Sequence, residues 1–488
     1  MISHPSGYCE KLAAADTKAI LEASFAILER AGMEVRSERA RALLQEAGAR
    51  VEPDTILVKF PEHLVRQSLA QVPSSFVLRA RNLEKNVTLG GRALATSPGY
   101  GSASVCGADG RRRPATAADF DEFARLACAC DAIDITGGLL VEPSDIPPAE
   151  RPRELTFRLI SISDKPFFGS VAGAEGARDS LELARIAMGP LDAPVMLALI
   201  NINSPLALDG RMAEALIAYA EAAQGILLTP GILMGITAPV TLAGALAQSF
   251  AEQLACLVLA QAAGPGVPVI LGTGGFGSDM RTGGSGFGRP ENALGTLCGA
   301  QIARSLGLPF RCSGGVTGSM LADARAGSES MMTALAAWTG GANLCLQAAG
   351  TLDNINAMSR EKFLMDAEIW SAIRRMGRRE GAGIEEIALE EILSRPESYI
   401  TADHTLAHHR ESLHSPPLSR AETYEGWLAA GGKDHAALAP ESLIRESHGQ
   451  APSRSAQPLD EKARAEMERY IRVPRRGSEP PSPSDRPT

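Results

Sequence analysis

Short apolar segments alternate with longer helical segments along most of this chain. From residue 91 onward, each short run of apolar or small residues is followed by a stretch with helical periodicity. The runs predicted as strands are 93–105, 133–141, 167–172, 195–202, 226–233, 269–275, 310–316 and 343–349. The helices predicted between them include 116–130, 176–188, 209–223, 240–263, 291–306 and 325–339. This alternation is typical of successive βα units around a parallel sheet.

The number of predicted strands decides between two α/β architectures. Eight strands with intervening helices favour a closed (β/α)8 barrel of the TIM type, and 488 residues suit such a barrel with insertions. An open doubly wound sheet is the alternative, because a single sequence does not fix the number of strands. We therefore predict an α/β (β/α)8 TIM-type barrel with helical N-terminal and C-terminal additions.

The segments outside the barrel differ from it in periodicity and composition. Residues 1–90 predict a helical N-terminal cap, residues 91–355 the barrel core, and residues 356–472 a helical C-terminal extension packed on the barrel. Helices are expected there at 359–380 and 384–394. Residues 473–488 are rich in proline, serine and charge, which is typical of a disordered tail.

Composition narrows the class of protein. The formal net charge of -9 disfavours a nucleic-acid partner, which requires a positive surface. The eight cysteines follow no disulfide or zinc spacing, so we interpret them as small buried residues in a reducing compartment. The N-terminus lacks an apolar signal core, and prolines and glutamines interrupt the apolar run 225–262. These features predict a cytoplasmic protein that has no membrane span.

Several common catalytic motifs are absent from the sequence. It contains no dinucleotide-binding GxGxxG before a helix, no Walker loop, no GxSxG, no HExxH and no paired CxxC. No set of residues predicts a metal site. Most histidines fall late in a polar region, where surface positions are the simpler interpretation: His404, His408, His409, His414, His435 and His448.

Small residues follow most of the predicted strands. In a barrel, the loops after the strands form the rim that carries the active site. The loops concerned begin at Ser97, Asn201, Met234, Thr273, Ser313 and Gln347. Their glycines allow a large planar ligand to approach the backbone closely, although plain tight turns are the alternative for any single loop.

The same loops resemble the trimethylamine methyltransferase family. The resemblance covers residues from about 20 to 472. It is carried by Met234-Gly-Ile-Thr-Ala-Pro-Val-Thr-Leu-Ala-Gly244, Asp279-Met-Arg-Thr-Gly283, Leu308-Pro-Phe-Arg-Cys-Ser-Gly-Gly315, Gly340-Gly-Ala-Asn343 and Ser359-Arg-Glu-Lys362. Further matches are Arg112-Arg-Pro114, Glu142-Pro-Ser-Asp145, Tyr399-Ile-Thr and His404-Thr-Leu.

This resemblance implies methyl transfer from a methylated amine to the Co(I) corrinoid of a small partner protein. The chain lacks the DxHxxG signature of corrinoid carriers and the His-x-Cys zinc signature of thiol-methylating barrels, so another protein must supply the corrinoid. It also lacks pyrrolysine, whose equivalent position lies near Thr317–Ser319. In this respect it resembles the branch that demethylates quaternary amines such as glycine betaine. A homo-oligomer is expected.

A quaternary amine suits this chemistry, because the leaving group is already a neutral tertiary amine and no acid is required. The substrate needs orientation, exclusion of water and an aromatic or carboxylate cage. Candidate substrate-binding residues are Tyr100, Asn203, Phe276, Asp279, Arg281 and Gly318. Candidate corrinoid-approach positions are Gly235, Thr237, Gly275, Gly314, Gly315, Thr317 and Gln347. Supporting roles are assigned to Glu252, Asp323 and Glu329.

Some residues keep two interpretations. Arg281 and Arg311 would bind a substrate carboxylate or pair with a nearby acid. Glu252 would otherwise belong to a buried ion pair, and Asp323 would cap the following helix. Two other functions also stay open: another barrel chemistry, such as that of a lyase or aldolase, and a non-catalytic binding subunit.

Overall fold

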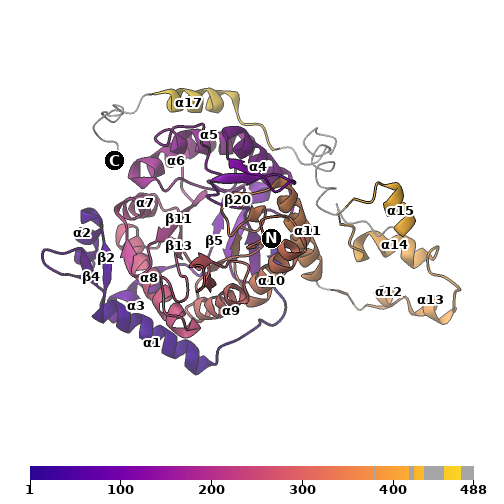
Figure 1. The fold of residues 1–488 in the computed structure, drawn as a ribbon, viewed down its shortest axis with the longest axis horizontal. Helices are drawn as coiled ribbons and strands as arrows, with labels where there is room; N and C mark the ends of the chain where they lie inside the picture. The colour runs from indigo at the N-terminus through magenta and orange to yellow at the C-terminus, as the bar shows by residue number, and fades with distance from the viewer. Residues whose placement is uncertain (379, 382, 417–422, 434–455, 474–488) are drawn as a thin grey trace.

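The computed structural model describes residues 1–378, 380–381, 383–416, 423–433 and 456–473. Its centre is a curved sheet of parallel strands surrounded by helices (Figure 1). In spatial order the parallel strands are β7 (Ala93–Thr96), β18 (Leu344–Leu346), β17 (Phe310–Ser313), β14 (Val269–Gly272), β13 (Gly225–Pro230), β11 (Met196–Ile202) and β10 (Phe167–Phe168). The short strand β1 (Ile2–Ser3) adds to β7 in antiparallel orientation.

The barrel is closed by a segment that is not a regular strand. Between β7 and β10, the amides of Asp134 and Ile135 donate to the carbonyl of Thr96, and the Thr136 amide donates to Pro166. The Phe168 amide then donates to Gly137. The strand predicted at 133–141 is therefore replaced by an irregular connection at the same place in the barrel. The closed TIM-type barrel is the fold, and the open sheet is excluded.

Most predicted elements form close to their expected positions. The surrounding helices are α4 (Ala117–Ala129), α5 (Arg151–Ile162), α6 (Gly173–Met188), α7 (Gly210–Glu221), α8 (Leu242–Ala263), α9 (Pro290–Ser305) and α10 (Ala324–Gly340). The helix α5 was not predicted. The strand predicted at 93–105 is two strands, because Pro98 and the positive φ of Gly101 break it before β8 (Ser104–Cys106).

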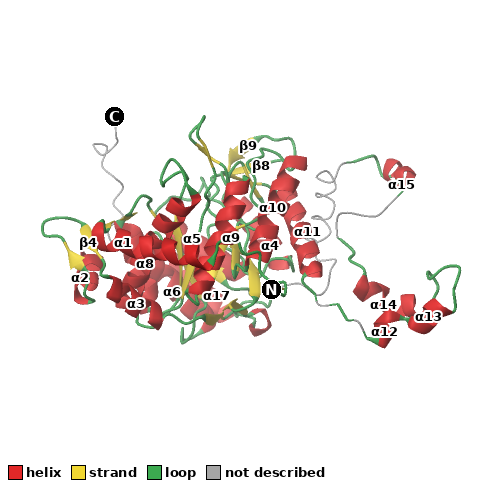
Figure 2. Ribbon diagram, turned by 90° about the horizontal axis from the view of Figure 1, so that it is seen from below, coloured by secondary structure: helices red, strands yellow, loops and turns green. Residues whose placement is uncertain are grey.

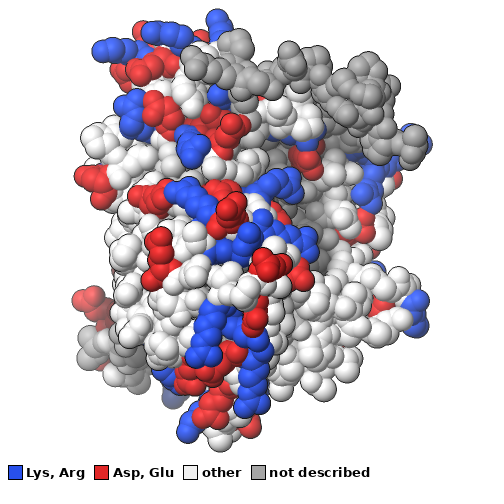
Figure 3. Space-filling view, turned by 90° about the vertical axis from the view of Figure 1, so that its left-hand side faces the viewer, with Lys and Arg blue, Asp and Glu red and all other residues white. Residues whose placement is uncertain are grey.

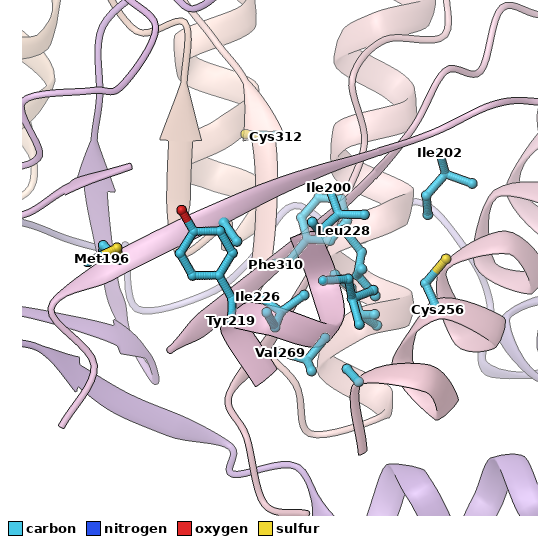
Figure 4. Close-up of a cluster of buried hydrophobic side chains, with 14 of the residues drawn as sticks. Met196, Ile200, Ile202, Tyr219, Ile226, Leu228, Cys256, Val269, Phe310 and Cys312 are labelled. Carbon is cyan, nitrogen blue, oxygen red and sulfur yellow. The ribbon is translucent and has the colours of Figure 1, made fainter. Parts of the chain in front are cut away.

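The barrel has an apolar interior and a second apolar layer outside the sheet. Side chains that point inward include Ala95, Leu197, Leu227, Ile270 and Leu344, all buried. The hairpin of β5 (Ser75–Leu78) and β6 (Val87–Gly90) contributes Leu78, Val87 and Leu89 to this inner cluster. Alternate residues pack outward under the helices: Ile200, Ile226, Leu228, Val269, Phe310 and Cys312 (Figure 4).

The N-terminal segment contains both helices and short strands. Its helices are α1 (Ala14–Arg30), α2 (Glu38–Glu46) and α3 (Glu62–Gln71). Its strands β2 (Met33–Val35), β3 (Arg50–Val51) and β4 (Leu57–Lys59) form a sheet with β12 (Ala207–Leu208), in the order β12-β2-β4-β3. Basic and acidic side chains are interspersed on this side of the molecule (Figure 3). Arg36 pairs with Glu34 and Lys59 with Glu52, so this face presents no uniform basic patch.

Among the residues that the structure describes, one helix is long and apolar enough to cross a membrane by length and composition alone. This helix is α8, and its residues Ala245–Gln261 are all buried. They pack between α1, α3 and the barrel strands. The structure thus uses α8 as a core helix, as the interrupting polar residues predict.

The C-terminal segment divides into parts that contact the barrel and a part that extends away. Helix α11 (Arg360–Met376) packs on α10, and α17 (Glu461–Arg472) packs on α5 and α6. Between them, α12 (Ile384–Ile387), α13 (Leu389–Leu393), α14 (Asp403–Ser412) and α15 (Tyr424–Ala429) project from the body (Figures 1 and 2). This projecting part differs from the extension packed on the barrel that we expected. The predicted tail after Val473 lies outside the described residues.

Candidate active site

The loops that follow the parallel strands meet on one side of the barrel. The Gln347 amide donates to Pro98, the Asn354 amide to Thr317, and the Met234 amide to Phe276. Strands β8 and β9 (Arg112–Pro114) join β19 (Thr351–Leu352) and β20 (Ala357–Met358) in a small sheet above this side (Figure 2). The predicted rim loops therefore form one connected ring.

Strand register places a group of polar side chains inside the barrel at this rim. Arg311 pairs with Leu344 and Ser313 with Leu346, and both leucines point into the barrel. Thr229 is two residues beyond the inward-pointing Leu227 and pairs with Asn201. Because side chains alternate along a strand, Arg311, Ser313, Thr229 and Asn201 share the interior face. The apolar interior thus becomes polar near the carboxyl ends of the strands.

Arg311 is the central cation of this group. Its side chain is 1% exposed, and its Nη1 donates to the carbonyl of Thr273 at 2.7 Å. Its Nη2 donates to Oε1 of Gln347 at 2.7 Å, and the Ser313 hydroxyl donates to the same oxygen. Burial lowers the pKa of Arg311 to about 10. Gly272 makes room for this side chain, since a Cβ there would lie 3.2 Å from it.

Three buried polar atoms near the strand ends have no hydrogen-bond partner. They are Nε of Arg311, Oγ1 of Thr229 and Oγ of Ser97, which follows the inward-pointing Ala95 by two residues. Buried polar groups in proteins are nearly always paired, so unpaired ones at a rim indicate a place for a ligand. Among the ion pairs of the described residues, none includes Arg311.

The mouth of the barrel is open to solvent. Asn201 is exposed, although it lies in β11, whose residues Met196–Ile200 are all buried. Asn203, two residues further, is exposed as well. Since Asn201 pairs with Thr229 in the sheet, exposed residues adjoin the buried polar group at the rim. Of the predicted substrate-binding residues, Asn203 lies at this opening.

Two aromatic rings lie inside the barrel near the mouth. Tyr100 and Phe168 form an edge-to-face pair with centroids 5.9 Å apart. Both belong to the inner cluster, with Phe168 buried and Tyr100 only partly so. A Cβ on Gly138 would lie 2.6 Å from Cβ of Phe168 and 3.1 Å from Cε2 of Tyr100. The aromatic position predicted at Tyr100 is thus inside the barrel, together with Phe168, which the sequence did not single out.

The structure does not bring Phe276, Asp279 and Arg281 to this interior. Phe276 is fully buried against Gly295 of α9. Asp279 lies in the hairpin of β15 (Ser278–Asp279) and β16 (Gly284–Ser285), where it pairs with Arg281 and Arg289. The Arg281 hydrogen bond lowers the pKa of Asp279 to about 2. Arg281 therefore pairs with a nearby acid, which was the alternative to binding a substrate carboxylate.

The predicted glycines mainly allow the rim loops to pack closely. A Cβ on Gly235 would lie 2.8 Å from Sδ of Met280, and one on Gly314 would lie 2.7 Å from Sγ of Cys345. Phe287 covers Gly275, and Gly315 lies against the carbonyl of Ala348. Glycine is needed at these positions because groups of neighbouring loops lie too close for a larger side chain.

The remaining predicted rim residues form hydrogen bonds with other groups of the protein. Thr237 Oγ1 donates to the Gly231 carbonyl, and Thr317 Oγ1 donates to Glu329 at 2.6 Å. The Gly318 amide also donates to Glu329. Asp323 caps α10 by accepting the Ala326 amide at 2.8 Å, as its capping interpretation predicts.

Glu252 stabilises the loop after β11. Its carboxylate accepts hydrogen bonds from the Ser204 hydroxyl at 2.6 Å, the Leu206 amide at 2.9 Å and the Gln248 side chain at 2.9 Å. No cation pairs with it among the described residues, so the buried ion pair is replaced by three neutral donors. Burial raises the pKa of Glu252.

The described residues contain no cluster of three His, Cys, Asp or Glu side chains that could hold a metal ion. His404, His408 and His409 lie on α14, away from the barrel, and His435 and His448 fall outside the described residues. Ser97, Asn201 and Ser313 were expected only as the first residues of rim loops, without a role of their own, and Thr229 was not singled out. Their only signal is that they are small polar residues near the ends of apolar strands.

Comparisons with known proteins agree with this architecture. The sequence profile of the trimethylamine methyltransferase family matches residues 1–479. The chain is 39% identical over 414 residues to a glycine betaine methyltransferase of Desulfitobacterium hafniense, covering 84% of this chain and 86% of that one. It is 28% identical to a proline betaine:corrinoid methyltransferase of Eubacterium limosum over 400 residues, which is 79% of this chain and 81% of that one.

A similar fold occurs in a solved structure. The monomethylamine methyltransferase of Methanosarcina barkeri matches with a TM-score of 0.54 at 12% identity, over 95% of this chain and 89% of that one. At this identity the match supports the fold alone. The family profile extends over nearly the whole chain, from the N-terminal segment through the rim loops to α17. The chain therefore belongs to the trimethylamine methyltransferase family.

Proposed function

We propose that this protein transfers a methyl group from a quaternary amine, bound in the barrel mouth, to the Co(I) corrinoid of a separate small protein. The observation that carries the proposal is the open mouth, where an aromatic pair and a buried polar group lie inside the same ring of loops. Family membership supports the reaction, since two relatives are named as proline betaine and L-carnitine corrinoid methyltransferases.

The reaction is a displacement at the methyl carbon. The electron pair of Co(I) forms the new bond to carbon, and the electrons of the broken C–N bond remain on nitrogen. A quaternary ammonium therefore leaves as a neutral tertiary amine, and no proton has to be supplied. The protein's contribution is to orient the methyl group and to exclude water.

Tyr100 and Phe168 suit the cationic part of the substrate. An aromatic face attracts a quaternary ammonium, by about 0.5–2 kcal/mol depending on its exposure to water. Both rings belong to the inner cluster of the barrel. Asn203, at the opening, is placed to contact a ligand entering from the rim.

The rim also carries a surface suited to the corrinoid protein. Large apolar side chains are exposed on three neighbouring loops: Ile236 (45%), Val240 (62%), Met280 (65%), Met320 (55%) and Leu321 (43%). Exposed apolar groups around a binding site are typical of a protein interface. A carrier docked here would place its corrinoid over the mouth, so the acceptor is a substrate presented by the partner. We assign this rim as the docking surface.

The projecting C-terminal arm, α12–α15, supports self-association. None of the described side chains between 385 and 433 is buried, and many are large and apolar. They include Ile392 (49%), Ile400 (77%), Leu406 (61%), Leu413 (67%) and Tyr424 (66%). A second copy of the chain would cover this arm, and symmetry would cover both arms in one interface. We place the oligomer in the cytoplasm, because all eight cysteines are free thiols.

The direct test uses the purified chain with Co(I) corrinoid protein and a panel of methylated amines. Quaternary amines should give the absorption spectrum of the methylated corrinoid together with a stoichiometric amount of tertiary amine, and trimethylamine should give neither. Turnover of trimethylamine alone, or of no amine at all, would contradict the proposal. Replacing Tyr100 by Leu should raise the KM for the quaternary amine by roughly tenfold, through loss of the aromatic face.

A further inference from the structure

We infer that three side chains on one face of α11, Lys362, Asp366 and Trp370, are positioning residues that fix the Gln347 amide against Arg311 in the barrel mouth. All three are fully buried, and they bond to backbone groups of the rim loops rather than to the polar group in the mouth. They act on the site through Gln347. The inference rests on the proposed function and extends its machinery to the helix behind the rim.

The three residues follow one another at intervals of about one helical turn. They are four residues apart, so their side chains lie in a row along one face of α11. Trp370 Nε1 donates to the Ala348 carbonyl at 2.7 Å, and Asp366 Oδ2 accepts the Gly350 amide at 2.9 Å. This face of the helix therefore bonds twice to the segment that begins with Gln347.

Lys362 connects this row to the neighbouring rim loop. Its Nζ forms an ion pair with Asp366, and it donates to the Gly315 carbonyl at 3.0 Å and to the Ser330 hydroxyl at 2.8 Å. Gly315 lies so close to Ala348 that a Cβ on it would collide with the Ala348 carbonyl oxygen. The ion pair therefore fixes the loops after β17 and β18 relative to each other.

The other side of the segment is bonded to the loop after β7. The Gln347 amide donates to the Pro98 carbonyl at 3.2 Å, and the next amide donates to the Ser97 carbonyl at 2.8 Å. Gln347 has a φ of 57°, a costly conformation for a residue with a side chain, which persists only where the surroundings enforce it. The segment is thus held between the β7 loop and α11.

The side chain of Gln347 carries this position to the mouth. Its Oε1 accepts hydrogen bonds from Arg311 Nη2 and from the Ser313 hydroxyl, both at 2.7 Å. The two acceptors that direct Arg311 are this amide and the Thr273 carbonyl. Catalysis by orientation is sensitive to such placement, since a shift of about 1 Å can cost roughly 100-fold in rate. A change at α11 therefore reaches the binding site.

Stability alone does not require polar groups on this face of the helix. Phe363, Leu364 and Ile373 are buried and supply α11 with apolar packing. In other proteins, replacing a buried ion pair by apolar residues of similar size is often neutral or stabilising. The polar groups of α11 lie where they meet the backbone around Gln347, which favours a role in positioning it.

The test is a double-mutant cycle between Trp370→Phe and Gln347→Ala. W370F keeps an aromatic ring in place but removes the donor to the Ala348 carbonyl. Binding of glycine betaine is measured by calorimetry without the corrinoid protein, and its KM is measured with that protein. W370F should raise both the Kd and the KM about fivefold, the effect of one lost hydrogen bond. In the Q347A background it should change either by less than about twofold, because the amide through which it acts is gone.

Trp338→Phe is the matched control. Trp338 is 7% exposed on α10, and its Nε1 donates to the Ser3 carbonyl at 2.8 Å. Ser3 pairs with the first residue of β7, at the end of the barrel away from the rim. W338F loses the same kind of bond, so its unfolding temperature should fall about as much as that of W370F. Its affinity for glycine betaine should stay within about twofold of wild type.

A second variant keeps the test decisive if W370F does not fold. Asp366→Asn retains an acceptor for the Gly350 amide but removes the charge that orients Lys362. It should raise the Kd for glycine betaine in the wild-type background and leave it within about twofold in Q347A. Dependence of both variants on Gln347 is the result that a merely structural role of α11 would not give.

The outcomes distinguish this inference from the proposed function. Equal loss of affinity from W370F in the wild-type and Q347A backgrounds, or an equal loss in W338F, would overturn the positioning role and leave the proposed function standing. Absence of methyl transfer from every quaternary amine in the wild type would instead refute the proposed function. The calorimetric cycle decides the positioning role in either case, because it needs no turnover.

Discussion

Arg311 and Gln347 are joined by a 2.7 Å hydrogen bond between Nη2 and Oε1 inside the barrel mouth. The bond connects β17 to the residue that follows β18. Gln347 has a φ of 57°, an unfavourable region for a residue with a side chain. It is held there by its amide, which donates to Pro98, and by the Ser313 hydroxyl. The backbone at the strand end thus positions the amide that orients the guanidinium.

Replacement of Gln347 should affect substrate binding through Arg311. In Gln347→Ala, Arg311 loses an acceptor, and a hydrogen bond to a charged group contributes about 1.5–3 kcal/mol. We expect the KM for a carboxylate-bearing substrate to rise by tenfold or more. In Gln347→Glu, the new carboxylate would neutralise Arg311 and compete with the substrate, so its KM should rise further. Steady-state kinetics of both variants check this order, and a lower KM for Q347E than for Q347A would contradict it.

Glu252 should determine the stability of the loop that carries Asn203. Glu252→Ala removes the acceptor for Ser204, Leu206 and Gln248, leaving buried donors unpaired at a cost of about 1–3 kcal/mol each before relaxation. Glu252→Gln retains an acceptor and the side-chain size, so it should be much less destabilising. Chemical denaturation of the two variants measures the difference. Equal destabilisation by both would mean that the hydrogen bonds contribute little.

The pH dependence of the Glu252 contribution has a defined sign. Burial raises its pKa in the folded protein above that of the unfolded chain, so the folded state holds this proton more tightly. The resulting stabilisation is fully present below the unfolded pKa and is lost as pH rises through the folded pKa. Relative to wild type, Glu252→Gln should therefore gain stability as the pH is raised through this range. Unfolding curves at several pH values check it, and an opposite slope would show that the three donors outweigh burial.

Lys362 and Asp366 form a fully buried ion pair that joins two rim loops. Lys362 Nζ donates to Asp366 Oδ1 at 2.5 Å and to the Gly315 carbonyl at 3.0 Å, while Asp366 accepts the Gly350 amide at 2.9 Å. Lys362→Met should destabilise the protein by about 3–5 kcal/mol, because an isolated buried carboxylate remains. The double variant Lys362→Met, Asp366→Leu should recover part of this loss. Chemical denaturation of the single and double variants measures the recovered stability. If the double variant recovers none, the loss in Lys362→Met does not come from an unpaired buried charge.

The exposed apolar side chains of the rim should contribute to binding of the corrinoid protein but not of the amine. Val240→Glu places a charge in the exposed apolar surface and should raise the KM for the corrinoid partner by about tenfold through lost apolar contact and the desolvation of the new charge. The KM for the amine should stay the same. Val77→Glu is the matched control, since Val77 is 48% exposed on β5, in the hairpin beneath the barrel. Equal effects of the two variants would place the partner elsewhere.

The projecting arm should control the oligomeric state. Ile392→Asp combined with Leu406→Asp introduces two charges where apolar side chains are 49% and 61% exposed. Buried unpaired charges oppose association, so the variant should become monomeric while its unfolding temperature as a monomer is unchanged. Light scattering of wild type and variant checks this prediction. A wild-type protein that is monomeric at micromolar concentration would refute it.

The sequence predicted much of the fold because the relevant signals are local. Alternating apolar strands and periodic helices identify βα units. Strands β11, β14, β17 and β18 lie within the predicted ranges, and β13 begins one residue before its predicted range. The capping role of Asp323 depends only on the residue that starts a helix. The position of the rim follows from chain direction, since every loop after a parallel strand lies at the same end.

The irregular and exposed parts could not be predicted in the same way. The closing segment near Ile135 has strand-like composition, but its hydrogen bonds go to Thr96 on one side and are set by the neighbouring strands. The arm α12–α15 has helical periodicity whether or not another surface covers it. Its exposure is a property of what surrounds it in space.

By itself, the sequence determined the barrel units, the rim and the family, because periodicity, chain direction and residue order are local properties of the chain. Only the tertiary structure decided which arginine lies at the mouth. Arg281 and Arg311 were equal candidates in the sequence, yet Arg281 is 86% exposed beside Asp279, whereas Arg311 is buried among neutral groups from β14, β17 and β18. The physical reason is that the presence or absence of a counter-charge depends on residues from distant strands, which meet only when the barrel closes.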